Sequence, residues 1–240
     1  MNILLIGGSG KFCEKLIKYG DGHSFLTPPK KLLDVREFSS IEYFFQHYDT
    51  EFDYVIHAGA ITRPMVVHEE NPTLSIQTNV IGTANVAMLC KEYNKKLIYI
   101  STDYVYSGTD GNYKETDAVK PFTNYGRSKL AGECCVQMYD NNLILRIAMT
   151  TKPFPHTKAL KDMKKSYMYT DDAAKITLKL LDETGIINVG GESQSVYEFV
   201  KKENPDIGFN YLSEISDVNM ATDCSMNTTR LKEVIDDSII

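Results

Sequence analysis

The stretch MNILLIGGSGKFCEKLIKY at residues 1–19 decides the fold of this chain. Residues 2–6 form an uninterrupted apolar run, which is typical of a strand buried on both faces of a sheet. Three glycines follow within residues 7–10, and residues 11–19 carry apolar side chains at helical spacing. A strand, a glycine turn and a helix in this order predict the first unit of a parallel α/β sheet.

The same alternation of strands and helices continues along the chain. We expect further strands at residues 24–26, 31–35, 54–60, 96–101, 143–147 and 186–189, and further helices at 39–47, 72–93, 125–139 and 171–181. Continuous apolar strands between helices predict a Rossmann-type α/β fold, in which a doubly wound parallel sheet is covered on both faces.

The rhythm weakens beyond residue 148, where the chain becomes rich in lysine, threonine and proline. We expect a loop with a short helix at 149–165. The length of 240 residues fits one domain with a small lobe attached. We therefore assign 1–148 to an NAD(P)-binding Rossmann domain, expect 166–192 to return to it, and assign 149–165 and 193–240 to a small C-terminal substrate-binding lobe.

Composition and charge exclude several functional classes. With 42% hydrophobic and 24% charged residues, the chain has the composition of a soluble globular protein, and its net charge of −6 argues against a nucleic-acid partner. No apolar run reaches the roughly 18 residues of a membrane span, and the first residues lack the pattern of a secretory signal. The five cysteines show no metal-type spacing, so we expect buried thiols and a cytoplasmic location.

The glycine turn has the spacing and the context of a dinucleotide-binding loop. Gly7 and Gly10 follow the first strand and open a helix. Glycine there lets the backbone approach a pyrophosphate, and the free N–H groups of the helix can bind it. Lys11 is a further candidate phosphate contact. The third glycine of the usual pattern is replaced by Cys13, which is also small.

The residues after the second strand bear on the choice of cofactor. Proteins that bind NAD(H) usually place an acidic residue about 20 residues beyond the loop, at the end of that strand. Here no carboxylate occupies residues 26–31, and Lys30 and Lys31 are present instead. Because lysine attracts the 2′-phosphate of NADP(H), the sequence favours NADP(H), with NAD(H) as the alternative.

Tyr125 and Lys129 stand four residues apart at the start of a predicted helix, so they share one face of it. A nearby ammonium group stabilises a phenolate and lowers the pKa of tyrosine, which makes this pair a proton donor with its tuning group. Ser101 and Thr102 end the preceding strand, where open α/β sheets bind their ligands. A threonine hydroxyl there can hold a reacting carbonyl oxygen beside the tyrosine.

These segments resemble those of the extended short-chain dehydrogenase/reductases that act on sugar nucleotides, and those of the dTDP-4-dehydrorhamnose reductase family most closely. Residues 101–108, STDYVYSG, look like the family segment STDYVFDG, and residues 124–133, NYGRSKLAGE, resemble its VYGRSKLAGE segment. Four shorter segments are also similar to family segments: 33–35, 57–60, 79–85 and 169–174. The resemblance covers residues 1–148 well and is patchy beyond them.

The resemblance implies hydride transfer from NADPH or NADH to the C4 keto group of a nucleotide-linked 6-deoxy sugar. Tyr125 would protonate the new alkoxide, Thr102 would orient it, and Lys129 would hold the nicotinamide ribose and tune Tyr125. The expected cofactor contacts are Gly7, Gly10, Lys11, Phe12, Asp34, Val35, Ala58, Gly59, Ala60, Ser101, Tyr125 and Lys129, and the expected substrate contacts are Arg63, Thr102, Asp103 and Tyr104. A homodimer through long helices is common in the family.

Three alternatives stay open at this point. A sugar-nucleotide 4,6-dehydratase typically needs a glutamate directly after Asp103, where this chain has Tyr104. A C4 epimerase that retains NAD usually has a larger second lobe. Some relatives of the reductase are regulatory subunits that bind NADP without turnover, and the loss of the third glycine fits such a role. The intact Thr102, Tyr125 and Lys129 speak against it.

The remaining polar residues are interpreted mainly as structural. We expect His57 to be a hydrogen-bonded core residue and the pair Glu69 and Glu70 to be solvated. The lysines at 158, 161, 164 and 165 are expected to form a solvated face, with contact to a substrate diphosphate as the alternative. The histidines have no thiol or carboxylate at ligand spacing, so we predict no metal site built by the protein.

Overall fold

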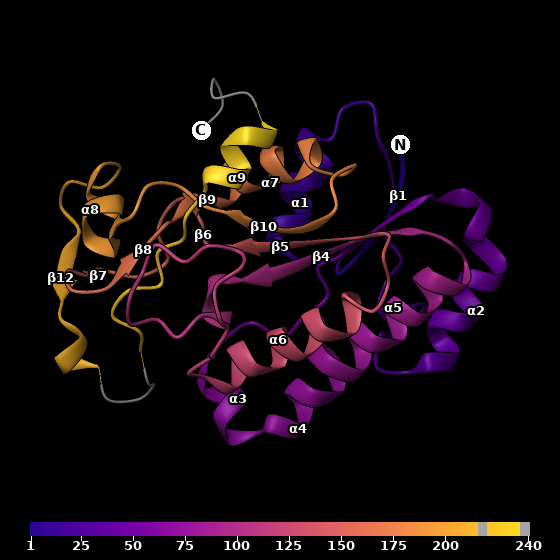
Figure 1. Cartoon of the computed structure of the whole chain (residues 1–240), viewed down its shortest axis with the longest axis horizontal. Helices are drawn as coiled ribbons and strands as arrows, with labels where there is room; N and C mark the ends of the chain where they lie inside the picture. The colour runs from indigo at the N-terminus through magenta and orange to yellow at the C-terminus, as the bar shows by residue number, and fades with distance from the viewer. Residues whose placement is uncertain (216–219, 236–240) are drawn as a thin grey trace.

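Six parallel strands form a central sheet in the spatial order β10-β5-β4-β3-β1-β2, which lies between two layers of helices (Figure 1). The strands are β1 (Asn2–Ile6), β2 (Ser24–Leu26), β3 (Tyr54–His57), β4 (Lys96–Thr102), β5 (Asn142–Ile147) and β10 (Gly185–Val189). The structure is a computed structural model, and it describes residues 1–215 and 220–235.

The central strands are buried on both faces, as their continuous apolar sequences require. Every residue of β4 and β5 is buried, and β1 is buried from its second residue onward. β1 is paired on both sides: its Ile3 lies opposite Phe25 of β2 on one side and Tyr54 of β3 on the other. The sheet confirms the predicted Rossmann-type α/β fold.

The strand expected at 31–35 was a wrong prediction. The backbone N–H groups of Leu32 and Leu33 donate to the carbonyl of Pro29, which forms turns instead of a ladder. Asp34 then accepts a hydrogen bond from the backbone N–H of Arg36, two residues on. Leu33 and Val35 are nevertheless buried. The apolar pattern of this segment therefore indicated burial correctly, but it did not indicate an extended backbone.

Two groups of helices cover the two faces of the sheet (Figure 1). The first group packs on one core cluster and consists of α1 (Lys11–Tyr19), α7 (Thr170–Lys179) and α9 (Thr229–Val234). The second group packs on another cluster and consists of α2 (Phe38–Tyr48), α5 (Gly82–Glu92) and α6 (Asn124–Val136). Short helical segments complete the chain: α3 (Val66–Glu70), α4 (Pro72–Ser75), α8 (Val196–Lys201) and 3-10 turns at Asp49–Glu51, Asp103–Val105 and Leu212–Glu214. None of the helices in the described ranges is long and apolar enough to cross a membrane.

The long helix expected at 72–93 contains a π-helical segment at Ile76–Ile81, between α4 and α5. This segment carries Asn79, whose side chain is fully buried. The Asn79 amide bonds both the N–H and the carbonyl of Ile61, at 2.8 and 3.0 Å, and donates to the Ser128 hydroxyl at 2.9 Å. Asn79 therefore ties the loop after β3 to helix α6, and π-helical segments often occur at functional sites.

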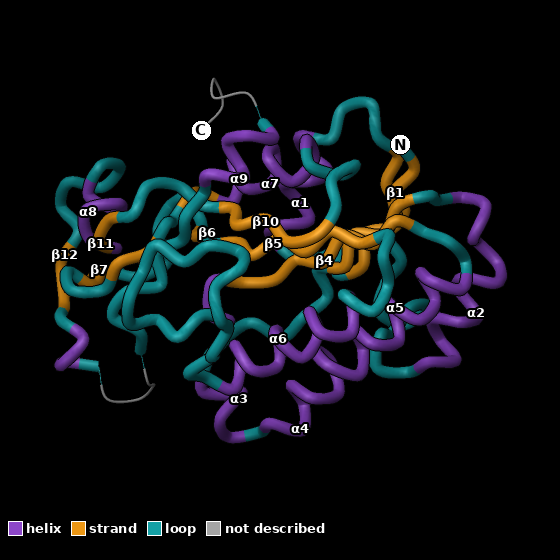
Figure 2. The backbone as a smooth tube through the Cα atoms, viewed as in Figure 1, coloured by secondary structure: helices purple, strands orange, loops and turns teal. Residues whose placement is uncertain are grey.

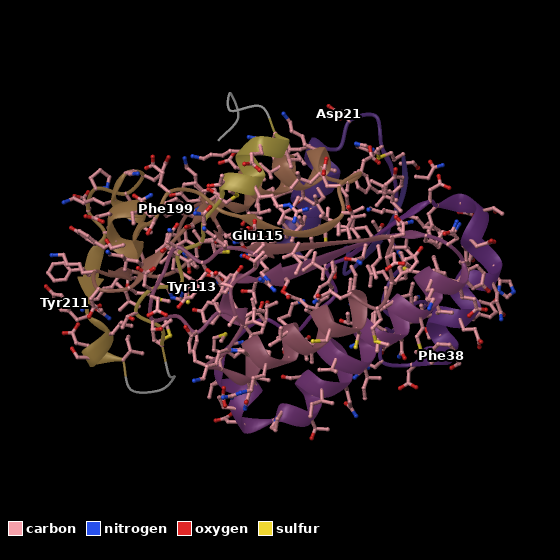
Figure 3. All side chains as sticks on the ribbon, viewed as in Figure 1. Asp21, Phe38, Tyr113, Glu115, Phe199 and Tyr211 are labelled. Carbon is pink, nitrogen blue, oxygen red and sulfur yellow. The ribbon has the colours of Figure 1, made fainter. Side chains whose placement is uncertain are left out.

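A small lobe lies at one end of the sheet, at the left in Figure 2. Its strands are β7 (Lys158–Leu160), β8 (Lys164–Lys165), β11 (Gln194–Ser195) and β12 (Gly208–Asn210), paired as β7-β12 and β8-β11. A further short pair, β6 (Met149–Thr150) with β9 (Met168–Tyr169), packs on the core cluster of β1 and α1. The short helix expected at 149–165 was a wrong prediction, because that segment forms short strands. Phe199 and Tyr211 lie in this lobe, and Tyr113 and Glu115 lie between the lobe and the sheet (Figure 3).

The expected assignment of 193–240 to the lobe also needs a correction. Leu231 and Ile235, in and after α9, belong to the same core cluster as β1 and α1. The chain therefore returns to the Rossmann sheet within the range expected for the lobe. Residues 216–219 and 236–240 of that range lie outside the described residues.

Candidate active site

The two halves of the sheet meet between β1 and β3. The chain leaves β1 toward β2 on one side and returns to β3 on the other, which creates the crevice where open α/β sheets bind ligands. Gly7 follows β1 with a φ angle of +90°, a conformation that favours glycine. A Cβ atom on Gly7 would lie 2.8 Å from the nitrogen of Gly59, which follows β3. Gly7 therefore allows these two loops to pack in contact.

Helix α1 begins directly beside this contact. Its N-cap residue Gly10 has no side chain to bond the first helical N–H groups, which therefore stay available for an anion. Lys11 is exposed at the first helical position. Phe12 is buried in the core, so its backbone and not its ring can face a ligand in the crevice. These residues fit the pyrophosphate of a dinucleotide.

The segment expected near the adenosine contains a neutralised carboxylate. Asp34 forms an ion pair with Arg36 at 2.6 Å, and the hydrogen bonds from Arg36 hold the pKa of Asp34 below its usual range. The nearby charge of Lys30 acts in the same direction. Val35 is buried and packs against Gly82 of α5, so it anchors this loop to the helix.

The expected catalytic residues come from two neighbouring elements. Thr102 ends β4, and Tyr125 and Lys129 lie in the first turns of α6. Thr123 caps α6 by accepting a hydrogen bond from the backbone N–H of Gly126 at 3.1 Å, which fixes where the helix begins. Thr102 lies close enough to Tyr125 to lower the pKa of its hydroxyl, so the structure brings the two side chains together.

Burial favours the uncharged forms of Tyr125 and Lys129 in the absence of a ligand. Burial raises the pKa of Tyr125 to about 12, against the opposing effects of Thr102, Lys165 and Arg63. Burial lowers the pKa of Lys129 to about 7. The Lys129 ammonium nitrogen lies 4.0 Å from the centre of the Tyr99 ring.

His68 of α3 packs behind Tyr125, a contact that sequence reasoning missed. Its ring centre lies 5.1 Å from that of Tyr125, and its Nδ1 is 2.6 Å from the Ser75 hydroxyl. Glu69 accepts hydrogen bonds from the backbone and the side chain of Asn124, at 2.9 and 2.6 Å. Glu69 is exposed as expected, and it also bonds the first residue of the helix that carries Tyr125.

A buried ion pair lies behind Thr102, and sequence reasoning missed it as well. Arg146 of β5 donates three hydrogen bonds to the Glu133 carboxylate of α6, and the closest approach of the two groups is 2.7 Å. The Ser101 hydroxyl donates to the same carboxylate at 2.5 Å. Ser101, expected to contact the cofactor, therefore has its hydroxyl bonded inside the protein. A charged residue within the apolar run 143–147 was the available signal, because a buried charge needs a partner.

Lys165 corrects the expectation of a solvated lysine face. Its side chain is 2% exposed, and its ammonium nitrogen lies 2.8 Å from Oδ2 of Asp103. Asp103, expected to contact the substrate, is buried and already paired with this lysine. Tyr104 is half-buried, and its ring lies 6.1 Å from the ring of Tyr125, centre to centre. Tyr104 is therefore the better placed of the two for contact with a ligand.

Positive groups lie near the crevice. Arg63 is exposed in the loop after β3, close enough for its charge to lower the pKa of Tyr125. A cavity of about 350 Å³ opens beside the start of α1, with Lys11, Lys15 and Lys152 in its wall. Lys15 is paired with Asp171 and Lys152 with Glu203, whereas no ion pair within the described ranges engages Lys11.

The remaining expectations have mixed outcomes. His57 is a core residue, with its Nε2 3.0 Å from the Thr83 hydroxyl, and burial lowers its pKa to about 3. Cys13 is buried as expected, whereas Cys134 is exposed and Cys135 is half-buried, because both lie on the outer side of α6. Among residues 1–215 and 220–235, no group of three or more His, Cys, Asp or Glu side chains could hold a metal ion.

The parallel sheet and the glycine contact beside its crevice together define a Rossmann-type α/β protein. More specifically, the model of the family described as the RmlD substrate binding domain matches residues 1–167, and the chain belongs to that family.

The chain is similar both to a subunit of methionine adenosyltransferase 2 and to a protein described as a probable reductase. Methionine adenosyltransferase 2 subunit beta of Bos taurus is 41% identical over 103 residues, which are 42% of this chain and 30% of that subunit. A protein of Haloferax volcanii, described as a probable low-salt glycan biosynthesis reductase, is 34% identical over 122 residues, 50% of this chain and 40% of that protein. The matched stretches therefore span well under half of either relative.

One solved structure shows the fold over nearly the whole chain. It is described as dTDP-4-dehydrorhamnose reductase from Bacillus anthracis in complex with NADP. The two chains superpose with a TM-score of 0.86 over 96% of this chain and 91% of that one, at 24% identity.

Proposed function

We propose that this chain catalyses the NAD(P)H-dependent reduction of the C4 keto group of a nucleotide-linked 6-deoxy sugar. The observation that carries the proposal is the meeting of Thr102 and Tyr125, with Lys129 one turn further along α6, at the carboxyl end of the sheet. Membership of the RmlD substrate binding domain family supports the proposal. The similar Haloferax volcanii protein and the similar structure from Bacillus anthracis, both described as reductases, support it as well.

Reduction of a ketone needs a hydride at carbon and a proton at oxygen. Bound NAD(P)H would supply the hydride. Tyr125 donates the proton: its O–H bond breaks as a new O–H bond forms on the substrate oxygen, and the tyrosine is left as a phenolate. Thr102 orients the substrate oxygen while negative charge develops on it.

The charge state of Tyr125 suits this direction of reaction. With a pKa raised to about 12, Tyr125 carries its proton at neutral pH. Lys129, with a pKa lowered to about 7, would be drawn to its ammonium form by the phosphates of a bound cofactor. The ammonium would then stabilise the phenolate, so cofactor binding would make Tyr125 a stronger acid.

NADP(H) is the cofactor that the adenosine side favours. Asp34 is neutralised by Arg36, and the exposed Lys30 and Lys31 add positive charge to the same loop. A 2′-phosphate gains from such a group of cations, whereas an unpaired carboxylate would repel it. The structure from Bacillus anthracis that shares this fold is described as a complex with NADP.

A second candidate is a subunit that binds NADP without turnover. The relative that is 41% identical is named as a subunit of methionine adenosyltransferase 2, which favours this candidate. The two candidates make the same prediction for cofactor binding and opposite predictions for turnover.

The test is an absorbance assay at 340 nm with NADPH or NADH and a dTDP- or UDP-linked 4-keto-6-deoxy sugar. The wild-type chain should oxidise the cofactor, and Tyr125→Phe should lose activity by about 10²- to 10⁴-fold, the usual contribution of a positioned acid. NADPH binding measured by calorimetry should be retained in the variant. Tight NADPH binding with no oxidation by the wild-type chain would move the assignment to the binding subunit.

A further inference from the structure

Lys165 and Asp103 form a buried ion pair next to the catalytic hydroxyl groups. Lys165 lies on β8 of the small lobe, whereas Asp103 directly follows Thr102 at the end of the central strand β4. The side chains are 2% and 3% exposed, and Nζ lies 2.8 Å from Oδ2. The other carboxylate oxygen, Oδ1, accepts a hydrogen bond from the Thr102 hydroxyl at 3.1 Å.

The groups that face this pair are aromatic or neutral, apart from the pair itself. The Lys165 ammonium lies 4.0 Å from the ring centre of Tyr104 and 4.9 Å from that of Tyr167. The Cys224 thiol also faces the pair, and burial raises its pKa to about 12, so it is neutral. Asp103 is the carboxylate that an ion pair links to Lys165 in the described part of the chain. The lysine therefore balances one charge, that of the residue beside Thr102.

We propose that Lys165 is a positioning residue of the reaction, which neutralises the carboxylate behind Thr102 so that Thr102 and Tyr125 can stabilise negative charge on the substrate oxygen. This inference rests on the proposed reductase function and names a part of the same site.

An unbalanced Asp103 would oppose the reaction in two ways. Its charge would repel the oxygen as hydride transfer makes that oxygen anionic, and in a buried site this repulsion is weakly screened. It would also hold the Thr102 proton through a charge-assisted hydrogen bond, about twice as strong as a neutral one. The hydroxyl could then not turn to donate to the substrate. Lys165 weakens both effects by pairing with the far oxygen of the same carboxylate.

The pair also links the lobe to the reacting groups. Lys165 is held by β8, which pairs with β11 of the lobe, and Asp103 belongs to the Rossmann sheet side of the site. The charge of Asp103 beside Thr102 is therefore neutralised by Lys165 when the lobe is packed on the sheet.

The test compares three variants of the full chain: Lys165→Met, Lys165→Arg, and Lys165→Met combined with Asp103→Asn. Steady-state kinetics would be measured from pH 6 to 10, with NADPH binding and thermal melting as checks on folding. Lys165→Met should lower kcat by about 10- to 100-fold, with a much smaller change in KM. The alkaline limb of its kcat profile should move to higher pH, because the unpaired Asp103 disfavours the Tyr125 phenolate. Lys165→Arg should keep most of the activity.

The double variant separates this role from a structural one. It removes both charges and leaves an amide oxygen to accept from Thr102, so it should regain most of the lost kcat and return the alkaline limb to the wild-type position. The proposal would be overturned if Lys165→Met had the kcat of the wild type and the same alkaline limb in its pH profile. It would also be overturned if the double variant folded stably but had no higher kcat than Lys165→Met. If the wild-type chain itself turns over no keto sugar, the proposed reductase function is wrong, and the role inferred for Lys165 is wrong with it.

Discussion

Replacing Lys129 by methionine should make the ligand-free protein more stable, although Lys129 is central to the proposed reaction. Lys129 is 2% exposed, and burial lowers its pKa from 10.5 to about 7. Burial therefore disfavours its charged form. Methionine has a similar length and carries no charge to bury.

The size of the effect follows from the two pKa values. At roughly 1.36 kcal/mol for each tenfold change in proton affinity, the drop from 10.5 to about 7 corresponds to about 5 kcal/mol of destabilisation below pH 7. The Lys129 ammonium lies 4.0 Å from the Tyr99 ring centre, and losing that contact costs about 2 kcal/mol. Lys129→Met should therefore raise the free energy of unfolding by about 3 kcal/mol at pH 6.

The sign of the pH dependence is specific. Between pH 7 and 10.5 the unfolded chain binds a proton at Lys129 that the folded chain does not bind, so the wild-type protein gains stability as pH rises. The variant lacks this gain, and its advantage should shrink across that window and vanish near pH 10.5. Denaturant unfolding of both proteins at pH 6, 8 and 10, without cofactor, measures it.

The matched control is the other buried lysine of the site. Lys165 has its pKa raised well above the usual value by Asp103, despite the opposing effect of burial, so Lys165→Met leaves a carboxylate unpaired. That variant should lose about 3 to 5 kcal/mol. If Lys129→Met is less stable than the wild type at pH 6, or if the difference does not change with pH, the reasoning about burial at Lys129 is refuted.

Three further predictions test the frame of the site. Glu133→Gln should lower the free energy of unfolding by about 3 to 5 kcal/mol, because Arg146 is left buried without its charge partner; a loss under about 1 kcal/mol in denaturant unfolding would contradict this. Gly132→Ala should cost about 1 to 3 kcal/mol in thermal melts, because its Cβ would lie 2.3 Å from the buried Tyr99 hydroxyl; an unchanged melting temperature would argue against the tight packing of α6 on β4. Arg63→Ala should raise KM for the nucleotide sugar by about tenfold with little change in NADPH binding, and an unchanged KM would remove Arg63 from the substrate site.

The order of elements and the glycine turn were predictable from the sequence, because they depend on local patterns. Apolar runs such as 2–6 and 143–147 are long enough to identify buried strands, and Gly7 lies where a tight turn is needed. The expected strand at 31–35 failed for a physical reason. Burial of alternate residues, as at Leu33 and Val35, occurs in turns as well as in strands. Here the backbone hydrogen bonds to the carbonyl of Pro29 show that the segment forms turns.

The parts of the site that were missed depend on contacts between distant segments. Lys165 stands in a run of surface lysines, and nothing near it in the sequence reveals that Asp103 meets it. The same holds for His68 and Tyr125, which are brought together by the packing of α3 on α6. Arg146 did carry a local signal, since a charge within an apolar strand needs a buried partner, but the partner Glu133 could not be identified without the fold.

The most direct test of the proposed reaction follows the hydride into the product. The chain would be incubated with NADPH that carries deuterium at the transferable position and with a dTDP- or UDP-linked 4-keto-6-deoxy sugar, and the nucleotide sugar would be examined by mass spectrometry and NMR. We expect one deuterium at C4 of the sugar alcohol, with stoichiometric formation of NADP⁺, and both should form about 10²- to 10⁴-fold more slowly with Tyr125→Phe. A keto sugar recovered without deuterium beside unoxidised NADPH, from a protein that binds NADPH, would contradict it.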